Sequence, residues 1–169
     1  MPVAHKGVSA SAVRRSRREK HLIGRREVVS LPEWRVRLRA KVDTGARTSA
    51  LDVDEIMPRA DGTVRFAVVL RRDRTQRVFV EAQISRVANV RPSSGEKQSR
   101  YFVKTLLRLG SVKKLVEISL VPRHGMLCRM LLGRSALSGD FIVDTDAVYR
   151  FGRLTRSTQR QAGGRKTRN

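Results

Sequence analysis

The residues best suited to chemistry are Asp43, Thr44 and Gly45, which directly follow alternating apolar and basic residues at 34–42. That period of two predicts a half-buried strand, so the Asp43 carboxylate falls at a strand end. Carboxylates hydrolyse peptides in pairs that share a proton, one acting as general base toward water and one as general acid. The chain holds a single Asp-Thr-Gly, so this chemistry needs two copies related by a two-fold axis. The alternative is a strand-to-turn corner in which Asp43 and Thr44 satisfy backbone groups.

A second element, residues 130–137, reads Met-Leu-Leu-Gly-Arg-Ser-Ala-Leu. Together with residues 43–46, Asp-Thr-Gly-Ala, it resembles one half of a retropepsin: a hydrophobic-Asp-Thr-Gly-Ala loop and a later apolar-apolar-Gly-Arg turn that enters a short helix. The resemblance implies that catalysis rests on Asp43, Thr44 and Gly45. It also implies a structural loop behind the catalytic turn, made of Leu131, Leu132, Gly133 and Arg134.

Residues 41–51, 103–110 and 130–144, taken together, resemble a smaller group within the retropepsin-like proteins. They are similar to a retropepsin-like group that bears the name ATP-dependent zinc protease and is associated with the ATP-grasp glutamate ligases that modify ribosomal protein tails. The match covers residues 22–151. It implies an all-β, retropepsin-like acid-protease half barrel with one short helix near 134–138. It further implies a homodimer, an acidic, glutamate-rich tail as substrate, and a glutamate ligase and the ribosome as partners.

The family name mentions zinc and ATP, but the sequence predicts no metal site and no cofactor. The chain contains no His-Glu-x-x-His, and although His124 and Cys128 are four residues apart, no third ligand accompanies them. It also lacks the Gly-x-x-x-x-Gly-Lys-Ser/Thr loop that holds nucleotide phosphates. We expect His124 in a loop and Cys128 in the core.

Two basic residues flank the Asp-Thr-Gly turn. Side chains two apart on a strand share a face, so Lys41 is expected beside Asp43, where a cation lowers the pKa of a carboxylate. In viral retropepsins an acidic residue stands where this chain has Arg47 and pairs with the arginine of the later Gly-Arg. Here Arg134 must find another partner or face solvent. We expect Lys41, Ala46 and Arg47 to bind substrate, with the two cations reading carboxylates. The alternative is that both are exposed strand-edge cations.

The formal charge of this chain of 169 residues is +22. Residues 1–21 carry +5 and residues 152–169 carry +6, which leaves +11 for residues 22–151, predicted as one β domain. Both ends lack apolar periodicity and are predicted to be disordered basic tails that attract RNA non-specifically. The alternative is that the tails only aid solubility.

The composition speaks against a membrane or secreted protein. No apolar run approaches the roughly 20 residues that a spanning helix needs. No apolar segment follows the N-terminal basic residues, so a secretory signal is not expected. The single cysteine, Cys128, fits a reducing cytoplasm, where we expect the protein to act.

Short apolar runs separated by turn residues predict the all-β fold. Strands are predicted at 22–30, 34–42, 48–53, 64–70, 77–84, 100–109, 113–121, 126–132, 141–143 and 148–151. A mobile loop is predicted at 87–97, and both this loop and the 64–84 hairpin are candidates for a flap over the cleft.

Two functions of different classes are consistent with these observations. The first is a homodimeric aspartic-type peptidase that cuts acidic peptide or protein tails. The second is a non-catalytic basic β-domain that binds RNA, the ribosome or an acidic protein. The charge favours the second, but aromatic residues are only 5% of the chain, which speaks against a sheet that stacks bases. The oligomeric state separates the two, because a monomer cannot pair two Asp43 carboxylates.

Overall fold

The computed structural model describes residues 19–90 and 98–154. The tails predicted at 1–21 and 152–169 lie almost wholly outside these ranges, as do residues 91–97. The prediction of an all-β, retropepsin-like fold with one short helix is confirmed. The elements are β1 His21–Gly24, β2 Arg26–Leu31, the 3-10 helix η1 Pro32–Trp34, β3 Val36–Val42, β4 Ser49–Pro58, β5 Thr63–Val69, β6 Arg77–Val90, β7 Gln98–Leu109, β8 Val112–Val121, β9 Met130–Leu132, α1 Arg134–Leu137 and β10 Phe141–Asp144.

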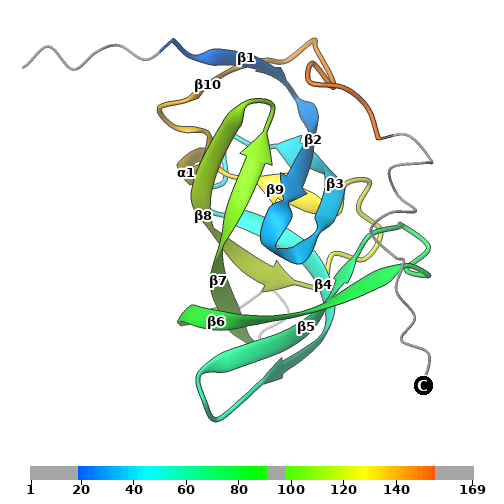
Figure 1. The fold of residues 1–169 in the computed structure, drawn as a ribbon, viewed down its shortest axis with the longest axis vertical. Helices are drawn as coiled ribbons and strands as arrows, with labels where there is room; N and C mark the ends of the chain where they lie inside the picture. Colours follow the sequence, from blue (N-terminus) through cyan, green and yellow to red (C-terminus); the bar gives the residue numbers. More distant parts are fainter. Residues whose placement is uncertain (1–18, 91–97, 155–169) are drawn as a thin grey trace, which may run out of the picture.

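The larger of two sheets contains eight strands in the order β2-β3-β9-β4-β5-β6-β7-β8. Additional pairings of β2 with β7 and of β4 with β8 fold this sheet back on itself into a small barrel. The second sheet pairs β1 with β10 in parallel. Figure 1 shows this pair along the top edge, at the opposite end from the hairpin that joins β4 to β5.

Burial on β3 alternates along the whole strand, with apolar side chains inside and basic ones outside. The inward residues join a core in which Leu38, Phe66 and Met130 are each at most 1% exposed. Each such side chain stabilises the fold by about 1.5–3 kcal/mol relative to an exposed one. The strand therefore stands firmly between the core and solvent, and its C-terminal end is a rigid support for the Asp-Thr-Gly turn.

The short strand β9 sets the geometry of the next connection. It lies between β3 and β4, parallel to β3 (Val42 opposite Leu132) and antiparallel to β4 (Leu51 opposite Met130). Residues 43–48, which link β3 to β4, must therefore pass over the end of β9.

Several predicted strands begin or end at other residues. The strand predicted at 22–30 is divided into β1 and β2, and the strand predicted at 48–53 continues to Pro58. Trp34 belongs to η1, not to the strand predicted at 34–42, because Pro32 begins a helical turn and Arg35 closes it in the left-handed region at φ 54°. The tilted ring of Trp34 then packs edge-on against Phe66, at 5.5 Å between ring centroids. Residues 126–129, predicted as strand, precede β9, which begins at Met130.

Two further segments differ from the prediction. Residues 87–90, predicted as loop, continue β6 and pair with β7. Residues 148–151, predicted as a closing strand, are turn and coil. Their backbone is held by a side chain instead, because the fully buried Glu27 accepts hydrogen bonds from the backbone N–H groups of Arg150 and Phe151.

No helix in the described ranges is long and apolar enough to cross a lipid bilayer.

Candidate active site

Asp43 stands at the end of β3 and organises the turn that begins there. Its Oδ1 atom accepts hydrogen bonds from the backbone N–H of Gly45 at 3.0 Å and of Ala46 at 3.2 Å. This arrangement is an Asx-type turn, in which a carboxylate replaces a backbone acceptor. No hydrogen bond or ion pair to Oδ2 is found within residues 19–90 and 98–154, and the side chain is half-buried. One oxygen of Asp43 thus fixes the turn and the other stays open.

The turn rests on β9 and on the start of α1. The Asp43 backbone N–H donates to the Leu132 carbonyl at 2.9 Å, which carries the β3–β9 ladder one residue into the turn. The backbone N–H groups of Arg134 and Ser135 donate to the carbonyls of Ala46 and Arg47. The predicted loop at 131–134 therefore lies directly beneath the predicted catalytic residues.

Arg134 holds the turn with its side chain as well. Its Nη1 donates to the carbonyl oxygens of Thr44 and Gly45, at 2.9 Å each. The sequence predicted that Arg134 must find another partner or face solvent, because Arg47 stands in the place of an acidic residue. The two carbonyls are its partners. A charged donor on neutral carbonyls fixes the turn without placing a second carboxylate next to Asp43.

Gly133 lets the two segments approach closely. A Cβ atom at this position would lie 2.5 Å from the Thr48 carbonyl carbon and 2.6 Å from its oxygen. The Gly133 N–H also donates to the Ser49 hydroxyl at 3.2 Å. Only a residue without a side chain fits beneath the turn at this point.

The predicted substrate-binding residues do not lie together. Lys41 lines a cavity of about 390 Å3 with Arg25, Arg26 and Arg123. Arg47 lines a different cavity of about 750 Å3, beside Thr44 and α1. Ala46 lies in the turn itself, where its N–H binds Asp43 and its carbonyl binds Arg134. Within the described part of the chain, no ion pair joins Lys41 to Asp43. The two cations therefore face separate spaces on either side of the turn.

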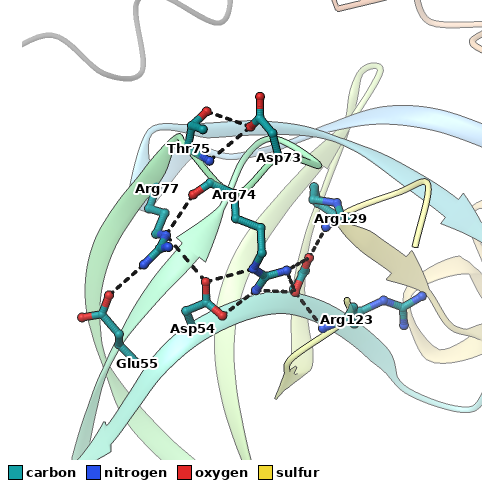
Figure 2. Close-up of polar contacts among 9 residues, drawn as sticks. Asp54, Glu55, Asp73, Arg74, Thr75, Arg77, Arg123 and Arg129 are labelled. Carbon is teal, nitrogen blue, oxygen red and sulfur yellow. Dashed lines mark hydrogen bonds and ion pairs between the residues drawn. The ribbon is translucent and has the colours of Figure 1, made fainter. Parts of the chain in front are cut away.

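A second carboxylate centre, not predicted from the sequence, lies nearby. Asp52 on β4 is fully buried and accepts hydrogen bonds from the Arg74 and Arg129 guanidinium groups and from the Arg123 backbone N–H. Figure 2 shows Arg74, Arg123 and Arg129 among the polar contacts of this region. Arg74 also binds Asp54, and chiefly this hydrogen bond holds the pKa of the Asp54 carboxyl below its usual range. We call Asp52, Asp54, Arg74 and Arg129 the arginine cluster.

Arg123 belongs to this second centre through its backbone N–H, which donates to Asp52. Burial lowers the pKa of its guanidinium, while the charge of Asp52 acts in the opposite direction. A run of apolar residues interrupted by Asp52 in the sequence Leu51-Asp52-Val53 is the signal that could have located the buried carboxylate.

The two residues considered as metal ligands differ in their exposure to solvent. His124 is exposed, whereas Cys128 is 5% exposed and burial raises the pKa of its thiol. The described ranges contain no group of three or more His, Cys, Asp or Glu side chains arranged to hold a metal ion.

Comparison with known proteins identifies the family of this chain. The profile of the RimB-like family, described as retropepsin-like aspartic endopeptidase RimB, matches residues 22–150. A probable alpha-L-glutamate ligase of Parasynechococcus marenigrum is 33% identical over 140 residues, covering 80% of this chain and 30% of that protein. One of Shewanella pealeana is 32% identical over 138 residues, covering 79% and 30%. The chain spans less than a third of the length of these curated relatives.

A solved structure shares the fold. It is a Legionella pneumophila protein of unknown function, with a TM-score of 0.66 and 24% identity, covering 78% of this chain and 98% of that one. The family predicted from the Asp-Thr-Gly turn and the Leu-Leu-Gly-Arg loop is confirmed. This chain belongs to the RimB-like family of retropepsin-like aspartic endopeptidases.

Proposed function

We propose that this chain is an aspartic-type peptidase that acts as a homodimer on acidic, glutamate-rich peptide or protein tails. The observation that carries the proposal is the Asp43 carboxylate, with Oδ1 fixed by the Gly45 and Ala46 N–H groups and Oδ2 without a partner in the described chain. A rigid carboxylate with one open oxygen suits a group that must take and return a proton.

The proposed reaction needs Asp43 of two protomers. Two carboxylates held close together share one proton, because both cannot be charged at once. The ionised member takes a proton from water, which attacks the peptide carbonyl, and the protonated member donates to the carbonyl oxygen. The tetrahedral intermediate then collapses: the C–N bond breaks, the carboxylate that took the proton from water gives it to the leaving amine, and the other carboxylate takes back the proton of the hydroxyl group. Thr44 and Gly45 shape the turn, and their carbonyls are anchored by Arg134.

The acidic substrate is supported by the charge around the turn. Lys41, Arg25, Arg26 and Arg123 line one cavity beside it, and residues 22–151 carry +11. Clefts lined by one sign of charge attract ligands of the opposite sign. Relatives named as glutamate ligases contain a stretch similar to this chain within a much longer polypeptide. A domain beside an enzyme that adds glutamate would meet glutamate chains as substrate, which is why we include a glutamate ligase and the ribosome as proposed partners.

The second candidate is a non-catalytic basic β-domain that binds RNA, the ribosome or an acidic protein. Its support is the total charge of +22. It predicts salt-sensitive binding that does not depend on Asp43.

The test is cleavage of a protein with a glutamate-extended tail, followed by mass spectrometry, with wild-type protein and with Asp43→Asn. We expect the wild type to shorten the tail and Asp43→Asn to lose at least about 10³-fold in rate, since the general base and acid are removed together. The Asp43→Asn protein must keep its oligomeric state for the comparison to hold. Equal activity in both proteins, or none in either from about pH 4 to 8, would favour the binding domain.

A further inference from the structure

A cavity of about 310 Å3 lies beside the segment that joins β5 to β6, and we call it the Arg129 pocket. Four arginines line it: Arg39 from β3, Arg71 and Arg72 from the β5–β6 connection, and Arg129 immediately before β9. The other described lining residues are three leucines, and the carboxylates that pair with Arg129 and Arg71, which are Asp52 and Asp73, are not among the lining residues. Such a lining attracts an anion.

Arg129 is the most unusual member of this wall. It is only 4% exposed, and its Nη1 donates to Asp52, but its Nε and Nη2 atoms have no hydrogen-bond partner in the described chain. These two nitrogens form one edge of the guanidinium plane, the edge that binds a carboxylate with two parallel hydrogen bonds. Buried donors are rarely left unpaired in native proteins, and an ordered water or a bound anion that reaches this buried edge would satisfy it.

The carboxylates of the arginine cluster are already committed. Asp52 binds Arg74 and Arg129, and Asp54 binds Arg74 and Arg77, as the dashed contacts of Figure 2 show for the labelled residues. In contrast, Arg39 and Arg72 form no ion pair within residues 19–90 and 98–154. The pocket thus contains two arginines, Arg39 and Arg72, that can still pair with a bound anion.

A second cavity adjoins the Arg129 pocket. Leu127 lines both the Arg129 pocket and the cavity that contains Lys41 and Arg123. Arg39, Lys41 and Asp43 follow one another on the same side of β3 and its extension, so Arg39 and Asp43 lie roughly 13 Å apart along the strand at about 3.3 Å per residue. That is the length of about four residues of an extended peptide.

We propose that the Arg129 pocket is a distal subsite that binds a carboxylate of an acidic peptide whose backbone runs along the Lys41 cavity toward Asp43. The proposal rests on the proposed function for the substrate class, and it adds a separate anchor about four residues from the reacting bond. A nucleic-acid phosphate would satisfy the same guanidinium edge, but the described linings of both cavities contain no aromatic side chain on which a base could stack. The peptide is therefore the ligand that the two linings favour.

The experiment measures binding rather than cleavage, using the full chain carrying Asp43→Asn so that the ligand stays intact. Fluorescent oligo-glutamate peptides of about two and about six residues are titrated by anisotropy at fixed salt. The pocket variant is Arg39→Gln with Arg72→Gln, two exposed positions outside the arginine cluster. The control is Arg37→Gln with Arg108→Gln, which removes the same charge from exposed positions that line neither cavity.

We expect the pocket variant to raise the Kd of the longer peptide about tenfold and the control to raise it less than about twofold, because a bound charge pair is stronger in a cavity than on an open surface. The shorter peptide, which cannot reach the pocket from Asp43, should bind all proteins of equal charge alike. Equal losses in the pocket variant and the control would mean diffuse attraction and would overturn the subsite.

Two competitors distinguish the source of the anion. Inorganic phosphate that displaces the longer peptide at equal concentration would indicate an isolated oxyanion site, and an oligouridylate that binds more tightly than the peptide and is weakened by the pocket variant would indicate nucleic acid. Either result overturns the proposal. If the wild-type chain binds the longer peptide but does not cleave it, the proposed function is contradicted and the subsite is not.

Discussion

Asp43 and Asp52 lie on either side of the same connection, and their surroundings are opposite. Asp43 is half-buried, is bound by two backbone N–H groups on one oxygen, and meets no cation in an ion pair within the described chain. Asp52 is fully buried, and both of its oxygens accept hydrogen bonds from arginine side chains. The same side chain is thus left open in one place and saturated in the other.

The difference separates two tasks of a carboxylate. A carboxylate bound by two guanidinium groups ties together β4, the β5–β6 connection and the segment before β9. A group held by neutral N–H donors keeps its position and retains an oxygen that can exchange a proton with water. Although the two aspartates are near each other in sequence, Asp52 joins segments of the fold and Asp43 keeps one oxygen without a partner in the described ranges.

Replacing each aspartate by asparagine tests this division most strongly. We expect Asp52→Asn to lower the free energy of unfolding by about 3–5 kcal/mol, because Arg129 is left buried with its charge uncompensated. Asp43→Asn keeps an acceptor for the turn and should change stability by less than about 1 kcal/mol. Urea unfolding of both variants measures the difference, and similar losses in the two would contradict the comparison.

Adding a methyl group beneath the turn should have the next largest effect. Gly133→Ala places Cβ against the Thr48 carbonyl, so we expect a loss of about 1–3 kcal/mol and displacement of the turn. Gly45→Ala is the matched control, since its Cβ would lie 3.3 Å from Asp43 Oδ1 and needs a smaller shift. Thermal unfolding should rank Gly133→Ala well below Gly45→Ala. The reverse order would mean that the turn is not held from below.

The smallest expected effect is on how the free energy of unfolding depends on pH. The hydrogen bond from Arg74 holds the pKa of Asp54 below its ordinary value of 3.8. A depressed pKa in the folded state contributes stability above the unfolded value and loses it as the pH falls through the folded one. Asp54→Asn should therefore be less stable than wild type at pH 7, and the gap should close below pH 3.8. Urea unfolding at both ends of this range checks it, with the exposed Asp146→Asn as control. A difference in the free energy of unfolding that does not change with pH would mean that Asp54 does not contribute to the loss of stability in acid.

The sequence predicts those parts of the fold and of the site that depend on residues close together in the chain. The alternation on β3 and the Asp-Thr-Gly turn are local patterns, and the hairpins at 63–90 and 98–121 follow from apolar runs bounded by turn residues. The family follows from the second motif at 130–137. These features can be recognised from a few consecutive residues.

The arginine cluster could not be predicted in this way. Asp52 meets Arg74 and Arg129 across separations of 22 and 77 residues, which only the pairing of β4 with β5 and β9 brings together. The partners of Arg134 are backbone carbonyls, which carry no signal in the sequence. The expectation that Lys41 and Arg47 both read carboxylates came from the strand periodicity and from the retropepsin motif, which do not show that the two residues line different cavities.

The central claim is that one site needs Asp43 from two protomers, and mixing the protomers tests it most directly. Wild type and Asp43→Asn are co-refolded at increasing fractions of wild type, and tail cleavage is measured per total protein. If both carboxylates are required, an equimolar mixture keeps about one quarter of the wild-type rate, because about one quarter of random dimers carry two Asp43 residues. A rate of about one half, falling in proportion to the wild-type fraction, would mean that each chain works alone and would contradict the paired-carboxylate account.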